Sequence, residues 1–432
     1  MPKQIITRLE DEVMTGAELM AVEGELEQYL ASYDEVFGRS ESREHFRRFA
    51  RGQMGPLERK SLEPMADAER VPPRGLQQFF TQYRWDEGAA RDSLQRRIAA
   101  RYGGEDGVFI VDETSDAKKG ECTAGVSRQY CGETGKIDNC IVTVHVAYAR
   151  QGFHALLDGE LFLPERWNPN PRDAALTAKR RRVKIPDDVV HEGKPAMALR
   201  QLRRVKANGV PGRWVSADEG YGGKPWWREA VAKEGYWYVV EVPKTVMGWA
   251  SEPRLGVPAY KGTGRRPHPC PTKAALTVAA LGHATRGLRF KKWQTFRVHD
   301  THKGPEVWEV KAGRFWEQGA NAPATAQWLL LARNVRTGEA KYFLSNAPAD
   351  TLLRTLVRVA FSRWHVERCF QDCKSELGLN HAELRDYRGL HRHLILTAIN
   401  YYFLQHRLGL WRRGEKSGRD GEPMCRRAAS AA

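Results

Sequence analysis

The sequence lacks the features that mark membrane, secreted and repetitive proteins. No apolar run approaches the roughly 18 residues that a membrane-spanning helix needs, and the 432 residues show no internal repeat. The N-terminal stretch lacks the apolar core of a signal peptide, so we expect a cytoplasmic protein. The seven cysteines are few and odd in number, which favours reduced thiols over a disulfide framework. A soluble globular protein of two or three domains fits this pattern.

Acidic side chains are also in short supply, and the deficit is uneven. The chain has 69 Lys and Arg against 53 Asp and Glu, a net charge of +16. Residues 1–100 carry 15 Lys and Arg against 18 Asp and Glu, so the rest of the chain has a net charge of +19. Such an excess indicates a polyanionic partner, most simply nucleic acid. Charge alone does not identify that partner, because other basic proteins share it.

Local patterns divide the chain into five segments, and the predicted fold class is α/β, with a mixed sheet flanked by helices. Residues 1–104 are predicted to form a helical DNA-binding region, and residues 105–243 alternate strand-like and helical runs. Residues 244–325 are rich in Gly and Pro and are predicted to form an inserted β-rich subdomain that hangs off the sheet. Residues 326–410 return to the α/β pattern, and residues 411–432 are predicted to be a basic, disordered tail.

Two aspartates close predicted strands. Asp112 ends the apolar run GVFIVD, and Asp218 ends WVSAD just before a Gly-rich turn. Ligands of open α/β sheets bind beyond strand ends, so both positions are candidates for a functional site. A single aspartate in such a place is more often a helix cap or turn former, and that alternative stays open for each.

A later helix carries charged residues on the side where apolar residues are expected. At 3.6 residues per turn, Arg363, Glu367 and Lys374 lie at about 300°, 340° and 320° from Ala360, within the apolar arc. Asp372 lies on the opposite side, which is predicted to be solvated. Buried charges are costly unless they are paired or bound to a metal. We interpret Glu367 as a ligand that meets other carboxylates, and a buried salt bridge is the alternative.

These three acids predict a metal site. Carboxylates that converge without compensation repel one another. Mg²⁺ prefers oxygen ligands and bridges to phosphate, and two such ions stabilise both oxygens of an in-line displacement at phosphorus. We therefore predict that Asp112, Asp218 and Glu367 bind Mg²⁺, with Mn²⁺ able to substitute.

The residues around these acids resemble the transposases of bacterial insertion sequences that have an RNase H-like fold and an Asp-Asp-Glu triad. The similarity is to the insertion-sequence-701 type, which is related to the insertion-sequence-4 group. It is carried by the motifs FRRFARGQMGPLERKSLEPMA, VDETSDAKKG, GVSRQYCGETGKIDNC, LFLPERW, VSADEGYG and WHVERCFQDCKSELGLNH. The resemblance implies that Asp112, Asp218 and Glu367, 106 and 149 positions apart, are the catalytic metal ligands.

The related group also carries Tyr, Arg, Glu and Lys at fixed spacing on the helix of the catalytic Glu. Arg363, Glu367 and Lys374 match this signature, whereas Ala360 stands at the position of the Tyr. The resemblance implies that Arg363 and Lys374 contact DNA phosphates.

Four further basic residues are candidate phosphate contacts. Lys118 and Lys119 follow the first strand, and Arg47 and Arg48 lie on a predicted helix of the N-terminal segment. A solvated surface is the alternative for both pairs.

Together these features predict a DNA transposase that binds the terminal inverted repeats of an insertion sequence and catalyses Mg²⁺-dependent cleavage and strand transfer. Its partners would be double-stranded transposon ends and target DNA, with a dimer or larger assembly in the synaptic complex, at the nucleoid. Two alternatives stay open. One is a catalytically silent, transposase-derived DNA-binding protein, and the other is a nuclease on the same fold.

Overall fold

The structure is a computed structural model that describes residues 16–260, 262–263, 268–301, 304–319 and 325–412. Its contacts divide the chain into two compact units. The first unit comprises residues 1–107, 112–212 and 365–432, and the second comprises residues 108–111 and 213–364. Strand β1 (Val108–Ala117) contributes to both, since its first four residues belong to the second unit and the remainder to the first.

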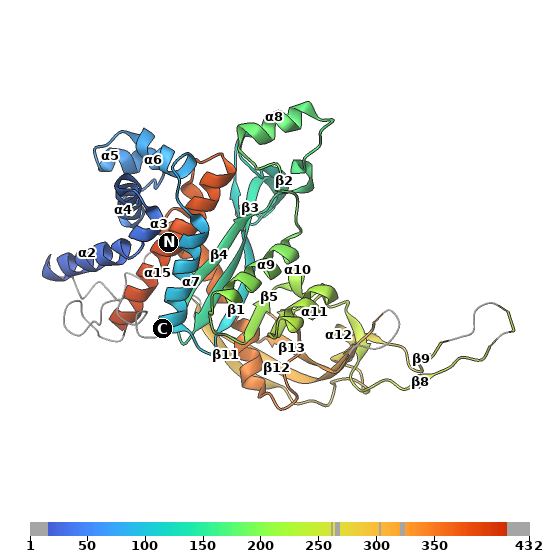
Figure 1. Ribbon diagram of the computed structural model, residues 1–432. Helices are drawn as coiled ribbons and strands as arrows, with labels where there is room; N and C mark the ends of the chain where they lie inside the picture. The colour runs from blue at the N-terminus through green and yellow to red at the C-terminus, as the bar shows by residue number, and fades with distance from the viewer. Residues whose placement is uncertain (1–15, 261, 264–267, 302–303, 320–324, 413–432) are drawn as a thin grey trace. The chain divides into compact units, whose positions relative to one another are not determined.

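The N-terminal part of the first unit is helical, which confirms the helices predicted there (Figure 1). Its helices are α2 (Gly16–Ala31), α3 (Asp34–Phe37), α4 (Ser40–Met54), α5 (Leu62–Ala68), α6 (Pro73–Thr81) and α7 (Glu87–Tyr102). Helices α4, α6 and α7 pack on the long helix α15 (Tyr387–Arg412). The middle of α15 is buried, including Tyr401 and Phe403, so this helix is the core of the N-terminal bundle.

A meander of three antiparallel strands completes the first unit. Strands β2 (Ser127–Cys131), β3 (Lys136–Arg150) and β4 (Phe153–Leu161) pair in sequence order, and β1 adjoins β3. Helices α7, α15 and α9 (Lys194–Ala207) pack against β4, which explains why nearly all of β4 is buried. The remaining elements are η1 (Glu165–Trp167), α8 (Ala174–Arg182), α14 (Trp364–Ser375) and η3 (Leu379–His381).

The second unit contains a mixed sheet. Strands β1, β5 (Trp214–Ala217) and β6 (Trp237–Glu241) are parallel. Antiparallel β14 (Ala340–Ser345), β13 (Gln327–Asn334) and β12 (Gly304–Glu317) continue the sheet from β6. Helices α10 (Glu219–Gly222) and α11 (Pro225–Lys233) connect β5 to β6, and α13 (Leu353–Ala360) packs on these two strands. A mixed sheet flanked by helices confirms the predicted fold class and is consistent with an RNase H-like fold.

We expected the segment 244–325 to hang off this sheet, but two of its strands pair within the sheet. Its elements are β7 (Met247–Trp249), β8 (Leu255–Gly256), β9 (Cys270–Pro271), β10 (Leu276–Thr277), α12 (Val278–Leu281), β11 (Gln294–Thr301) and β12. Strand β12 pairs with β13 and β11 pairs with β12, so both strands extend the sheet. The reason is burial, since Trp308, Val310 and Phe315 of β12 are almost fully buried. The division into domains stays a prediction.

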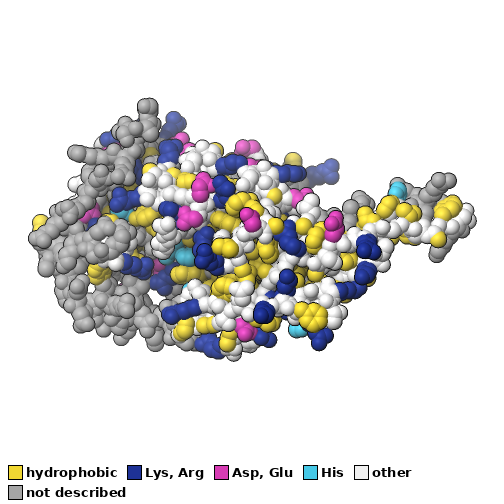
Figure 2. All heavy atoms as spheres, turned by 90° about the horizontal axis from the view of Figure 1, so that it is seen from below, with side chains coloured by type: hydrophobic (Ala, Val, Ile, Leu, Met, Phe, Trp, Pro, Cys, Tyr) yellow, Lys and Arg dark blue, Asp and Glu magenta, His cyan; other side chains and the backbone are white. Residues whose placement is uncertain are grey.

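The hairpin of β8 and β9 is different, because it forms a two-stranded sheet of its own. It projects from the rest of the second unit in Figure 1, and Figure 2 shows hydrophobic and basic side chains along it. Leu255 and Tyr260 of this hairpin are about half exposed.

Three further predictions concern the whole chain. The predicted tail, 411–432, lies outside the described residues except for Trp411 and Arg412, which end α15. No helix in the described part is long and apolar enough to cross a membrane. The cysteines of the described part are free thiols, as predicted, at positions 122, 131, 140, 270, 369 and 373.

Candidate active site

The two predicted aspartates follow paired positions of adjacent parallel strands. The register of β1 and β5 puts Val111 opposite Ala217. Asp112 is the next residue after Val111, and Asp218 is the next after Ala217. Strand β5 ends there, whereas β1 continues to Ala117, so the prediction that Asp112 closes its strand is wrong. On its other side from β5, strand β1 adjoins β3.

Both aspartates are oriented by backbone N–H groups. Asp112 is buried, and its Oδ1 accepts a hydrogen bond of 2.8 Å from the N–H of Glu113. Asp218 caps α10, since its Oδ1 accepts from the N–H groups of Gly220 and Tyr221 at 2.9 and 3.4 Å. Its Oδ2 accepts no hydrogen bond from a described residue. Asp218 is therefore a helix cap, which was the alternative role considered for it. The cap uses only Oδ1, so Oδ2 is left for a ligand.

The turn after Asp218 requires glycine because α10 lies close to β6. A Cβ atom on Gly222 would lie 2.0 Å from the carbonyl oxygen of Glu241 and 3.0 Å from the Cβ of Val240. Real Cβ atoms do not approach so closely, so a larger residue would displace the turn. The glycine thus lets the N–H groups of α10 stay aimed at Asp218.

Glu367 lies in the first turn of α14. It was predicted on the apolar side of the helix, but its side chain is exposed. The predicted angles were measured from Ala360 along one continuous helix, but the turn η2 (Phe361–Arg363) is a 3₁₀ turn between α13 and α14. A 3₁₀ turn advances by about 120° per residue instead of about 100°, so α14 is out of phase with α13. The buried side of α14 consists of Val366, Cys369, Phe370, Asp372 and Cys373.

Asp372 is the second correction on this helix. It was predicted on the solvated side, yet it is buried. Its Oδ1 accepts a hydrogen bond from Nε of Arg368 at 2.8 Å, and its Oδ2 accepts one from the hydroxyl of Tyr401 at 3.2 Å. Burial raises the pKa of Asp372, although Arg368 acts in the opposite direction. The partner Tyr401 comes from α15, which the local pattern of α14 does not reveal.

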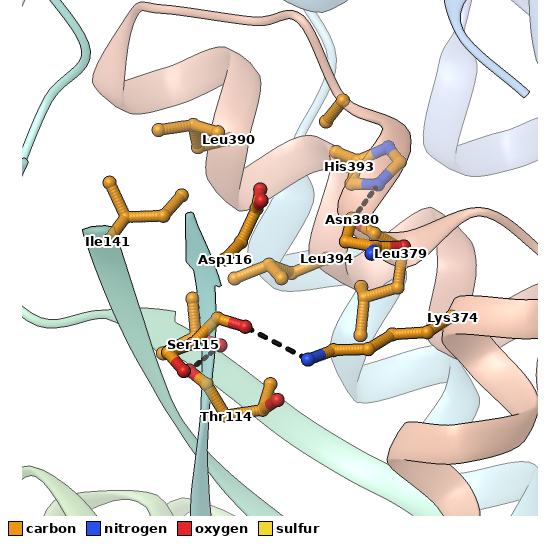
Figure 3. A pocket seen from close by; sticks show the side chains of 12 residues that line it. Thr114, Ser115, Asp116, Ile141, Lys374, Leu379, Asn380, Leu390, His393 and Leu394 are labelled. Carbon is orange, nitrogen blue, oxygen red and sulfur yellow. Dashed lines mark hydrogen bonds between the residues drawn. The ribbon is translucent and has the colours of Figure 1, made fainter. Parts of the chain in front are cut away.

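Lys374 connects α14 to β1 within the first unit (Figure 3). Its side chain is half-buried, and Nζ donates a hydrogen bond of 2.9 Å to the carbonyl oxygen of Ser115. Asp116 lines the same cavity, whose volume of about 30 Å³ has room for about one water molecule. Burial raises the pKa of Asp116, which Lys118 and Lys374 partly offset. The motif spacing on α14 gave no sign of this contact with β1.

The other predicted DNA contacts differ in exposure. Arg363 is half-buried and interacts within the chain. Lys118 forms an ion pair with Asp116, and its Nζ donates to the carbonyl oxygen of Ala382 at 3.1 Å. Lys119 is exposed. Phosphate contacts by these residues stay predictions, and Lys119 is the most accessible of the three.

The arginines of α4 form ion pairs with acids of the same helical region. Arg47 pairs with Asp34 at 2.9 Å and with Glu27 at 3.4 Å, and Arg48 pairs with Glu44 at 3.1 Å. Both arginines therefore have acidic partners within this region. Their role in DNA binding stays a prediction.

Asp112 and Glu367 belong to the first unit, whereas Asp218 belongs to the second. Among the described residues, no group of three or more His, Cys, Asp and Glu side chains is arranged to hold a metal ion. The donor set of the three acids is nonetheless composed of carboxylate oxygens alone, and hard cations such as Mg²⁺ prefer such ligands.

Comparison with known proteins gives the class of the chain. The family described as "DDE superfamily endonuclease" matches residues 32–305, and the chain belongs to this family. The matched range includes Asp112 and Asp218 and ends before Glu367.

A curated relative is more specific. The chain is 30% identical over 198 residues to the probable transposase for insertion sequence element IS701 of Microchaete diplosiphon. This alignment covers 46% of the chain and 48% of the relative, so the chain spans about half of that protein. Family and relative both agree with the resemblance seen in the sequence.

Proposed function

We propose that this chain is a DNA transposase that binds the terminal inverted repeats of an insertion sequence and catalyses Mg²⁺-dependent cleavage and strand transfer. The register of β1 and β5 carries the proposal, because Asp112 and Asp218 follow the opposed residues Val111 and Ala217 in a chain of the DDE superfamily. Similarity to a probable transposase supports this function over that of another nuclease.

In this proposal the carboxylates of Asp112, Asp218 and Glu367 hold Mg²⁺ or Mn²⁺. When bound, a divalent ion supplies positive charge that stabilises the attacking and leaving oxygens at phosphorus. Asp218 is oriented beforehand by the N–H groups of Gly220 and Tyr221, which lowers the cost of ordering the ligand when DNA arrives. Glu367 lies on an exposed position of α14, where a ligand can reach it.

Basic residues that flank these acids in the sequence would position the DNA. We assign phosphate contacts to Arg363, Lys374 and Lys119, because phosphate contacts fix the register of the duplex. Water and then the freed 3′-hydroxyl of the DNA act as nucleophiles, so no protein side chain forms a covalent bond to DNA. Joining requires two transposon ends, and we therefore propose at least a dimer in the active complex, at the nucleoid.

A strand-transfer assay tests the proposal. Labelled duplexes that carry the ends of the element encoding this chain would be incubated with full-length protein, MgCl₂ and a target plasmid. We expect labelled ends to be cut and joined to the plasmid, and EDTA to abolish both products. The variant Glu219→Ala is the matched control for Asp218→Ala, because it removes the exposed acid next to Asp218 and should retain activity. Cutting without joining would indicate a nuclease, and binding without cutting would indicate a silent DNA-binding protein.

A further inference from the structure

A cleft of about 450 Å³ lies beside α6 in the first unit. Its lining comes from the polar face of α6, the start of α5, the C-terminal end of α8 with Lys184, and the segment that follows η3. The cleft is lined by Leu62, Glu63, Arg74, Gln77, Gln78, Thr81, Gln82, Arg182, Lys184, Glu383, Leu384, Arg385 and Asp386. None of these residues belongs to the predicted catalytic triad.

Helix α6 is clearly two-sided. Leu76, Phe79 and Phe80 are fully buried. Residues 74, 77, 78 and 81 line the cleft, and their spacing of three and four puts them on one helical face. This face therefore presents guanidinium, amide and hydroxyl groups to the cleft. The first two are the side-chain groups that make bidentate hydrogen bonds to guanine and adenine edges.

The C-terminal end of α6 is fixed by a buried arginine of α15. Arg392 donates hydrogen bonds to the carbonyl oxygens of Phe79, Phe80 and Trp85 at 3.0, 3.1 and 3.0 Å. It also forms an ion pair of 3.1 Å with Glu87. Because these contacts fix the helix, its polar face is presented in one orientation before any partner binds.

Helices α5 and α6 also have the order and spacing of a helix-turn-helix. They contact each other and are separated by four residues, 69–72. In that motif the second helix enters the major groove, and residues near its N-terminus contact base edges. Arg74 lies in the first turn of α6 and Gln77 is its middle residue, and both line the cleft.

The charges of the cleft favour an anionic partner. Four basic and three acidic residues line it. Two of the acids are already paired, Asp386 with Lys184 at 3.5 Å and Glu383 with Arg59 at 2.8 Å. Arg74, Arg182 and Arg385 are exposed, and they form no ion pair with a described residue. The arginines of α4 differ in this respect, because they are paired with acids.

We propose that this cleft is a binding site for duplex DNA, in which Arg182 and Arg385 contact phosphates and α6 reads bases through Arg74, Gln77 and Gln78. The inference rests on the proposed function, since it takes DNA as the partner. It assigns sequence recognition to α6 and not to the arginines of α4.

Selection from a library of duplexes with a randomised 20-base-pair segment tests the proposal with the full-length chain. We expect Gln77→Ala and Gln78→Ala to change the selected sequence and to weaken binding to the wild-type sequence by roughly tenfold each, because lost base contacts carry specificity. The double variant Arg182→Ala, Arg385→Ala should weaken binding to all duplexes and lower the salt slope by about two units. The matched control is Arg96→Ala, which removes an exposed arginine of α7 outside the cleft.

The outcomes separate this inference from the proposed function. The proposal for the cleft is overturned if the glutamine variants select the wild-type sequence. It is also overturned if the salt slope of the double variant equals that of the Arg96→Ala control. Both results count even if strand transfer persists. A wild-type chain that neither binds nor cuts duplex DNA would overturn both proposals. Circular dichroism of each variant verifies folding, and Gln77→Glu is a second probe that should weaken binding by adding negative charge to the cleft.

Discussion

Asp112 and Asp218 are placed by strand register, whereas Glu367 and Lys374 are placed by the phase of a helix. Register depends on backbone pairing over four consecutive residue pairs between β1 and β5. Apolar runs reveal such strands well, and the residue after each run is then known. Helix phase accumulates along the chain, so one irregular turn changes every later position. Predictions that rest on strand pairing therefore tolerate local irregularity better than predictions that rest on a long helical projection, even though β1 continues past Asp112.

The largest expected effect removes each acid in turn. Asp112→Ala, Asp218→Ala and Glu367→Ala should each reduce cleavage and joining below detection, because each removes a proposed metal ligand. Binding to end DNA should stay within a few-fold of wild type, since phosphate contacts dominate affinity. The measurement is the strand-transfer assay together with a binding titration.

Glu376→Ala is the matched control for the helix, because Glu376 is exposed and follows the end of α14. If Glu367→Ala retains strand transfer while both aspartate variants lose it, the assignment from strand register would stand and the assignment from helix phase would fail. This result would remove Glu367 from the proposed site.

The two kinds of signal also explain how much the sequence alone predicts. The predicted strands at Asp112 and Asp218 are confirmed, because both contain short apolar runs, although β1 continues past Asp112 to Ala117. The 3₁₀ turn at residues 361–363 was not predicted, since no Pro or Gly marks it. Burial of Asp372 was missed because its hydroxyl partner, Tyr401, comes from another helix.

Tertiary partners account for the other differences. The ion pairs of Arg47 involve Glu27 and Asp34, which belong to other helices than α4. The sheet partner of β12 is β13, and Gly-rich composition suggested a separate subdomain instead. The cleft beside α6 combines residues from segments a hundred or more positions apart, which a local pattern does not bring together.

A smaller effect sharpens the assignment of helix phase. Asp372→Ala should lower the free energy of unfolding by about 3 kcal/mol, because Arg368 and the hydroxyl of Tyr401 both lose their acceptor in a buried site. Glu376→Ala should change it by less than about 0.5 kcal/mol, as is usual for an exposed residue. Urea titration of both variants measures the difference. Equal effects would contradict the buried position of Asp372 on α14.

The smallest expected effect concerns Lys374, whose structural and DNA-binding roles can be measured on one preparation. Lys374→Met keeps most of the aliphatic chain but removes the donor to Ser115, so we expect a loss of about 1 kcal/mol in the free energy of unfolding. If Nζ also contacts a phosphate, the salt slope of DNA binding should fall by about one unit. The comparison variant Lys119→Met should lower the slope without a loss of stability, because Lys119 is exposed. A stability loss with an unchanged slope would assign Lys374 to the contact between α14 and β1 alone. The phosphate contacts assigned under the proposed function would then rest on Arg363 and Lys119.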